Sequence, residues 1–290
     1  MKKITLIILT LILFFGFFVF LLQSRPSTVD NSKLQVTASF YPMYFFANQI
    51  GGDKVQVTNI TPTGAEPHDY DLTSQDIIKI QNSKLLILNG KVETWADKIK
   101  TNLKNKNTKV LIAGENLGTE TDPHIWLSPH LAKLESEKIA DSLEKIDPAN
   151  SDYYKNNLID LENKLNKIDA NYKDGLANCQ LKSFVTSHAA FGYLAKDYRL
   201  TQVAIEGLSP DAEPSLSELV QITDFVRKNN VKIIFFESLV SPKLSQTIAN
   251  EVGAKTLVLD PIEGVINIKD NYLTLMANNL QNLRTALQCK

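Results

Sequence analysis

Three of the chain's four histidines lie in loops that follow predicted β-strands and lead into helices. They are His68, His124 and His188, and a carboxylate, Asp260, follows another predicted strand in the same way. In open α/β sheets, the loops at the carboxyl ends of the strands meet at one crevice, where ligands bind. Three imidazoles and one carboxylate that meet there would suit a borderline-soft divalent cation. The sequence therefore predicts a metal site assembled from residues far apart in the chain.

The neighbours of these residues support the same interpretation. A proline directly precedes both His68 and His124 and restricts the backbone at each ligand. Glu237 follows the apolar run of another predicted strand, so we expect it beside the ligands or as an alternative ligand. The fourth histidine, His130, falls in the first turn of a predicted helix, where we expect it on the surface.

Length and composition are those of an ordinary globular protein. The 290 residues can form one large domain or two of ordinary size, and the formal net charge is −1. A charge so close to zero gives no sign of a surface that binds nucleic acid or a polybasic membrane patch. We therefore expect no nucleic-acid partner.

The first two dozen residues are an export signal rather than part of the fold. Two lysines precede an almost unbroken apolar run from Ile4 to Leu22, whose length approaches that of a membrane-spanning helix. No clear cleavage site follows the run, which favours an uncleaved anchor; the alternative is a cleaved signal peptide. In both cases the body of the protein, after a polar tether at residues 26–33, lies outside the cytoplasmic membrane, in the periplasm or at the cell surface.

Cys179 and Cys289 are the only cysteines. An oxidising compartment allows a disulfide between them, which would join the chain end to its own domain. The alternative is a pair of free thiols. Neither lies at the end of a predicted strand, so we do not expect them to bind the metal.

The rest of the chain alternates strands with helices. Short runs rich in Val, Ile, Leu and Phe predict two series of four strands, which is typical of a mainly parallel sheet covered by helices on both faces. Between the two series, one apolar stripe from Tyr154 to Tyr172 recurs at spacings of three and four, and predicts a single long helix. The fold class we expect is α/β, with two lobes, each built on a mainly parallel four-stranded sheet, bridged by one long spine helix. The expected boundaries are 1–25 for the signal or anchor, 26–33 for the tether, 34–147 and 177–290 for the lobes, and 148–176 for the spine helix.

Several motifs in order resemble those of one transporter family. The chain resembles the zinc/manganese solute-binding proteins of bacterial ABC transporters, the cluster A-I or TroA-like family, over residues 34–290. The resemblance is carried by these stretches: Ala38-Ser39-Phe40-Tyr41-Pro42, Glu66-Pro67-His68-Asp69-Tyr70, Asp122-Pro123-His124-Ile125-Trp126, Ser187-His188-Ala189-Ala190-Phe191, Gly207-Leu208-Ser209-Pro210, Phe236-Glu237 and Leu259-Asp260-Pro261.

The resemblance implies two lobes bridged by a rigid helix, with one divalent cation buried between them. The four ligand positions of the family fall on His68, His124, His188 and Asp260. Zinc-type members commonly carry His at the third position and manganese-type members carry Glu, so His188 indicates Zn²⁺, with Mn²⁺ or Fe²⁺ as the alternative. Imidazole nitrogen also suits Zn²⁺ better than Mn²⁺. Many zinc-type relatives have a His-rich loop before the second ligand and a lipid-bearing cysteine; this chain has neither.

The function expected is capture of Zn²⁺ outside the membrane and its delivery to an ABC-transporter permease by a monomeric, non-enzymatic protein. A zinc hydrolase that uses Glu237 as general base is the enzymatic alternative, but the chain has no His-Glu-x-x-His helix and no nucleophile motif. Adhesion to a host or matrix is the other alternative. A ligand bound without metal, and still bound by a His68→Ala variant, would support that role.

Overall fold

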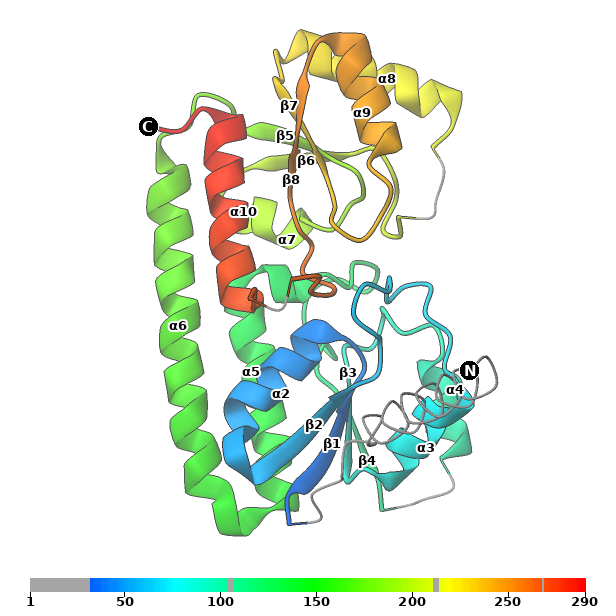
Figure 1. Ribbon diagram of the computed structural model, residues 1–290. Helices are drawn as coiled ribbons and strands as arrows, with labels where there is room; N and C mark the ends of the chain where they lie inside the picture. The colour runs from blue at the N-terminus through cyan, green and yellow to red at the C-terminus, as the bar shows by residue number, and fades with distance from the viewer. Residues whose placement is uncertain (1–31, 104–106, 211–213, 268) are drawn as a thin grey trace, which may run out of the picture. The chain divides into compact units, whose positions relative to one another are not determined.

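Two separate parallel sheets organise the chain in the computed structural model, which describes residues 32–103, 107–210, 214–267 and 269–290. Residues 33–290 form one compact unit, and all that follows concerns this unit. The two sheets lie in different lobes, and one long helix runs alongside both (Figure 1). The expected α/β class, with two four-stranded parallel sheets and a long connecting helix, is confirmed. The exact lobe boundaries remain a prediction.

The first sheet has the strand order β2-β1-β3-β4, and all its pairs are parallel. The strands are short runs rich in apolar and β-branched residues, in the number that the sequence predicts for one lobe. Every residue of β3 is buried, because helices cover both faces of the sheet. The bounds are β1 Leu34–Ala38, β2 Val55–Asn59, β3 Leu85–Leu88 and β4 Lys109–Ile112.

The second sheet repeats this topology with the order β6-β5-β7-β8, again with parallel pairs only. In each lobe the first strand pairs with the second on one side and with the third on the other, so the strand order reverses beside it. Such a reversal opens a crevice at the carboxyl ends of the strands. The bounds are β5 Ser183–Thr186, β6 Thr201–Ala204, β7 Ile233–Phe236 and β8 Lys255–Val258.

Capping residues explain where several helices begin. Thr73 and Asp76 form a capping box at α3, and Ser128 caps α5, whose first residue is a proline. A second capping box, from Ser215 and Glu218, opens α8. The helices of the first lobe are α2 Tyr41–Gly51, α3 Ser74–Asn82, α4 Ala96–Asn102 and α5 Pro129–Ile146; those of the second are α7 Gly192–Asp197, α8 Leu216–Lys228, α9 Lys243–Val252 and α10 Tyr272–Leu287.

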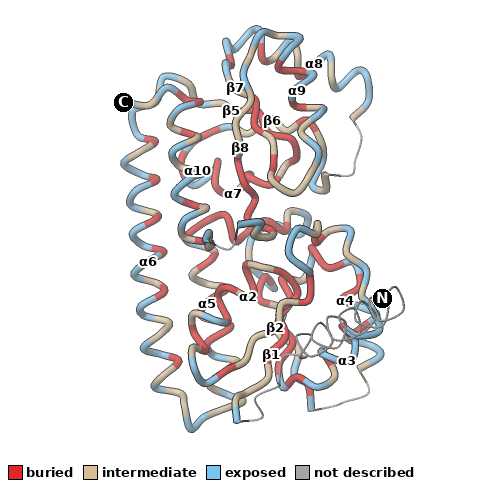
Figure 2. Tube along the Cα trace, viewed as in Figure 1, coloured by how far each residue is buried: buried red, intermediate tan, exposed pale blue. Residues whose placement is uncertain are grey.

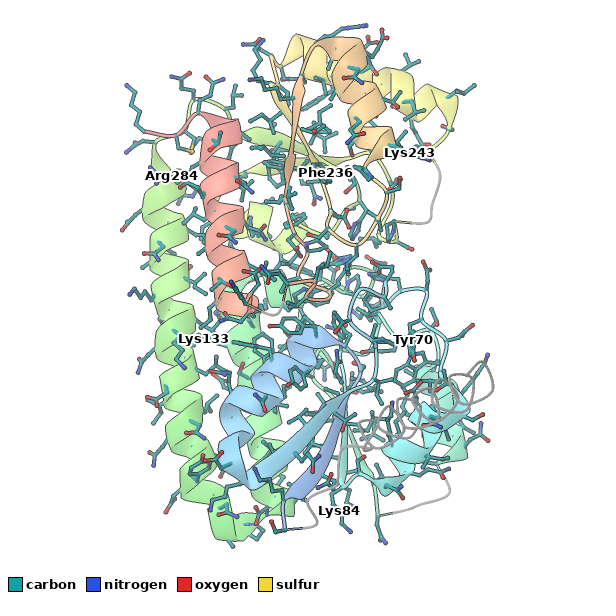
Figure 3. All side chains as sticks on the ribbon, in the orientation of Figure 1. Tyr70, Lys84, Lys133, Phe236, Lys243 and Arg284 are labelled. Atoms are coloured by element: carbon teal, nitrogen blue, oxygen red, sulfur yellow. A yellow bond between two sulfur atoms is a disulfide. The ribbon has the colours of Figure 1, made fainter. Side chains whose placement is uncertain are left out.

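The long helix α6 spans Ser151–Ala177, directly after a short 3-10 turn at Pro148–Asn150. Its buried stripe is close to the predicted one, with Leu176 buried and Leu158 only half-buried. Figure 2 shows the alternation of buried and exposed positions along this helix. The helix packs on α5 and α2 of one lobe and on α10 of the other, where Arg284 and Leu280 lie against Gly175 (Figure 3). One rigid element therefore supports both lobes.

The chain end is joined to the start of the second lobe. Cys179, just after α6, and Cys289, just after α10, form a disulfide and also pair as an isolated antiparallel bridge. The bond fixes the C-terminal end of α10 beside the end of α6.

Nearly all of the apolar N-terminal segment and tether, residues 1–31, lies outside the described residues. Within the described residues, none of the helices has the length and apolar character that a membrane span requires.

Candidate metal site

Side chains from four loops converge between the two sheets. The imidazoles of His68, His124 and His188 meet the carboxylate of Glu263, and one ligand atom from each lies within 4.8 Å of all the others. His124 and His188 are completely buried, Glu263 is 1% exposed, and the side chain of His68 is 9% exposed. The structure therefore brings together the three histidines selected from the sequence.

Several distances between the four ligand atoms are close to those of a tetrahedral site. Nε2 of His124 lies 3.3 Å from Nε2 of His188. Oε1 of Glu263 lies 3.3 Å from Nε2 of His68, 3.4 Å from Nε2 of His124 and 3.8 Å from Nε2 of His188. Zn²⁺ with bonds of about 2.0–2.1 Å would hold tetrahedral ligands about 3.3–3.4 Å apart. These ligand atoms are thus close enough together to bind one zinc ion.

Glu237 orients His188. Its Oε1 atom accepts a hydrogen bond from Nδ1 of His188 at 2.6 Å and another from the backbone N–H of His188 at 3.2 Å. The hydroxyl of Ser187 donates to the same oxygen. A carboxylate can only accept, so Nδ1 carries the proton and Nε2 presents its lone pair to the centre of the site. Glu237 therefore lies beside His188 and outside the group of converging atoms.

Asp122 orients His124 in the same manner. Its Oδ1 atom accepts from Nδ1 of His124 at 2.8 Å and from the backbone N–H of His124 at 3.0 Å. The preceding loop is held to the first lobe by Asn89, whose side-chain amide donates to the carbonyl of Pro123 at 3.2 Å. Two of the three imidazoles thus have a fixed tautomer that points Nε2 inward.

A sharp backbone turn delivers Glu263. Ile262 has a φ of +59°, which is uncommon for any residue except glycine and strained for a β-branched one. The turn is held by Asp260, whose Oδ1 atom accepts from the backbone N–H of Ile262 at 2.7 Å, and by Trp126, whose ring N–H donates to the carbonyl of Pro261 at 2.7 Å. This local strain aims Glu263 at the histidines.

Asp260 itself does not belong to the group of converging atoms, which differs from the expectation that it completes the ligand set. Its carboxylate accepts hydrogen bonds from the backbone N–H of Ile262 and from the hydroxyl of Ser238. The side-chain amide of Asn279 accepts from the backbone N–H of Asp260 and donates to its backbone carbonyl. Asp260 therefore supports the turn, and Glu263 is the carboxylate that lies among the three histidines. The signal available in the sequence was a second acidic residue shortly after Asp260; the direction of its side chain depends on the strained turn.

The electrostatics of the site favour a bound cation. Burial alone would raise the pKa of Glu263, but hydrogen bonds from His124 and His68 hold it below the ordinary value. Burial alone would lower the pKa of His124, but the hydrogen bonds with Asp122 and Glu263 raise it to about 9. Oε2 of Glu263 is buried and has no hydrogen-bond partner within the described part of the chain. A buried, unpaired carboxylate oxygen is costly unless a cation or proton satisfies it.

A cavity of about 600 Å³ lies beside the His68 loop. Glu66 and Asp69 line it from one lobe, and Glu206 and Lys243 line it from the other. Figure 3 labels Lys243, and Tyr70, which follows Asp69. Glu66 accepts from the backbone N–H of His68 at 3.2 Å, and burial together with the charge of Glu263 raises its pKa to about 9. His130 is exposed, as expected, and takes no part in the site.

Comparison with known proteins adds a family to this geometry. The sequence model of the family described as "ZnuA: Zinc-uptake complex component A periplasmic" matches residues 36–286. The high-affinity zinc uptake system protein ZnuA of Bacillus subtilis is 37% identical over 295 residues, which cover 92% of this chain and 92% of that protein. The zinc-binding lipoprotein AdcA of Streptococcus pneumoniae is 37% identical over 309 residues; the match covers 98% of this chain but spans only 61% of AdcA.

Solved structures agree with the sequence matches. The Zn(II)-bound ZnuA-like domain of Streptococcus pneumoniae AdcA is 39% identical with a TM-score of 0.78, over 88% of this chain and 99% of that one. The laminin-binding protein Lmb of Streptococcus agalactiae, described as bifunctional with adhesin and metal transporting activity, is 34% identical. Its TM-score is 0.83, over 88% of this chain and 99% of that one.

Proposed function

We propose that this chain, which belongs to the ZnuA family of periplasmic zinc-uptake components, captures Zn²⁺ outside the cytoplasmic membrane and delivers it to the permease of an ABC transporter. The family is one of solute-binding proteins, so the chain is a transport component and not an enzyme. The ion is its cargo.

The observation that carries the proposal is the spacing of four inward-facing ligand atoms. We assign the ligand set to His68, His124, His188 and Glu263. Three neutral imidazoles and one carboxylate leave a bound Zn²⁺ with a net charge of about +1, and the nearby carboxylates of Asp122 and Glu237 offset part of it. A buried site with four closely spaced protein ligands suits retention of the ion, because a catalytic zinc keeps one position open for water.

The donor set also favours zinc over manganese. Mn²⁺ prefers oxygen ligands, whereas three of the four donors here are imidazole nitrogens. The usual affinity order places Zn²⁺ above Mn²⁺ and Fe²⁺ for the same donors. The adhesin description of the Lmb relative belongs to that protein, and no feature of the described residues favours adhesion here.

Delivery requires that the loaded protein stay near the membrane and be recognised there. The apolar run from Ile4 to Leu22 would hold it at the outer side of the cytoplasmic membrane, in place of the lipid anchor of the relatives called lipoproteins. We propose that it acts as a monomer whose ligands, drawn from both lobes, close the lobes around the ion. The permease would then distinguish loaded from empty protein.

The test is a competition titration of the purified protein with Zn²⁺ and Mn²⁺ against a metal indicator. We expect tight retention of one Zn²⁺ and much weaker retention of Mn²⁺. The His188→Ala variant should lose zinc, while the control His130→Ala, which changes an exposed histidine, should keep it. Equal retention of both metals would overturn the zinc assignment, and cells that lack the chain but grow normally under zinc limitation would overturn the transport role.

A further inference from the structure

A tyrosine of the second lobe holds the loop that carries a ligand of the first. Tyr193 lies in α7, a few residues after His188, and its hydroxyl reaches the loop that precedes His124. The hydroxyl accepts from the backbone N–H of Thr119 at 2.7 Å and donates to the carbonyl of Asp122 at 3.0 Å. It also lies 3.1 Å from the hydroxyl of Thr119. One phenol oxygen thus fixes both ends of a short loop segment.

Glycines on both sides make room for this contact. A Cβ added at Gly118 would lie 2.3 Å from the Tyr193 hydroxyl, and Gly118 has a φ of +68°, which also favours glycine. A Cβ added at Gly192 would lie 3.0 Å from a carboxylate oxygen of Asp122. The loop and α7 therefore approach each other more closely than ordinary side chains would permit.

The contact continues to the metal site through a single residue. Asp122 is held at its carbonyl by Tyr193, and its carboxylate holds both the ring Nδ1 and the backbone N–H of His124. A shift of the Asp122 backbone would therefore move the group that sets the orientation of this imidazole. A second bond to α7 comes from the start of α5, where the hydroxyl of Ser128 donates to Asp197 at 2.5 Å.

We infer that Tyr193 is a positioning residue for zinc: it aligns Asp122 with His124 and so makes retention of the ion depend on the contact between α7 and the loop 118–122. The inference rests on the proposed function, since it concerns the same bound ion. Loss of a residue that orients a metal ligand typically lowers metal affinity by about 10–100-fold. Because Tyr193 acts one contact further out, loss of its hydroxyl should have a smaller effect. We expect zinc dissociation to become about fivefold to tenfold faster.

The experiment measures zinc dissociation from the full-length protein with an excess of a chromophoric chelator. Tyr193→Phe keeps the ring and removes the hydroxyl, and we expect dissociation about fivefold to tenfold faster than in the wild type. The matched control is Tyr153→Phe, which removes a hydroxyl of another helix, α6, that accepts from the backbone N–H of Asp53 at 3.3 Å. The control should release zinc at the wild-type rate. Gly118→Ala provides a second route to the same effect, since its methyl group would displace the Tyr193 hydroxyl.

A double-mutant cycle separates positioning from a general structural effect. If Tyr193 acts through Asp122, adding Tyr193→Phe to Asp122→Asn should cause little further acceleration, although each change alone is effective. Dissociation rates that multiply fully in the double variant, or a Tyr193→Phe rate equal to that of the wild type, would overturn the inference while the proposed function stands. A wild-type protein that retains no zinc would overturn both.

Discussion

Oε1 of Glu263 lies 3.3 Å from Nε2 of His68, although the two residues are 195 positions apart and come from loops of different lobes. This contact identifies Glu263, rather than Asp260, as the carboxylate that faces the histidines. The two acidic residues stand close together in the sequence but have separate tasks, which variants can distinguish.

We predict that Glu263→Gln weakens zinc binding far more than Asp260→Asn. Removing Glu263 deletes the carboxylate that we propose as a ligand, so the loss should exceed the range of about 10–100-fold that is typical of residues outside the ligand set. Asp260→Asn keeps an oxygen that can accept from Ile262, and its effect should stay within about tenfold. Competition titration against a chelator measures both. A greater loss with Asp260→Asn would reverse the assignment.

Zinc binding should strengthen as pH rises. The pKa of His124 is raised from 6.5 to about 9 in the folded, metal-free protein, so the protonated ring contributes stability below pH 6.5 that is lost as pH rises through 9. Zinc binds the deprotonated ring, and must displace that proton over this range. Apparent affinity should therefore increase up to about tenfold per pH unit between pH 6.5 and 9. Titrations at several pH values check this, and an affinity that is constant over that range would contradict it.

Glu237→Gln should reduce zinc affinity without unfolding the protein. The amide no longer offers a charged acceptor to Nδ1 of His188, so the ring is oriented less firmly and is less basic. We expect a loss of about 10–100-fold. Glu251→Gln, at an exposed glutamate of α9 that pairs with Arg227, is the control and should bind zinc normally. Equal affinities for the two variants would show that Glu237 does not support the ligand.

Removal of the disulfide should affect stability and leave zinc affinity unchanged. Cys179 and Cys289 are 110 residues apart, and the entropy of so large a loop corresponds to about 4–5 kcal/mol of stabilisation. The double variant Cys179→Ser with Cys289→Ser should therefore unfold at lower denaturant concentration. Its zinc affinity should match that of the wild type, because the bridge lies at the ends of α6 and α10 and not at the site. A normal denaturation midpoint would contradict the first expectation.

Much of the fold follows from local sequence. Helix α6 covers Ser151–Ala177, close to the predicted 148–176, because one apolar stripe marks its length. The three histidines could be identified because parallel strands bring their carboxyl-end loops to a common crevice. These signals act over a few residues or follow from topology.

The remaining parts of the site depend on contacts that a single sequence does not reveal. The direction of Glu263 follows from the left-handed backbone of Ile262, which tertiary bonds from Trp126 and Asp260 maintain. The bond from Tyr193 to Asp122 joins residues 71 positions apart in separate lobes. No sequence motif marks the turn at Ile262 or the contact between Tyr193 and Asp122.

A crystal structure of the zinc-loaded protein, with anomalous scattering recorded at the zinc absorption edge, would identify the atoms that bind the ion. We expect one strong anomalous peak with Nε2 of His68, His124 and His188 and an oxygen of Glu263 about 2.0–2.2 Å away. A peak bound by Asp260 in place of Glu263, or a zinc ion that lacks any one of the three imidazoles, would contradict it.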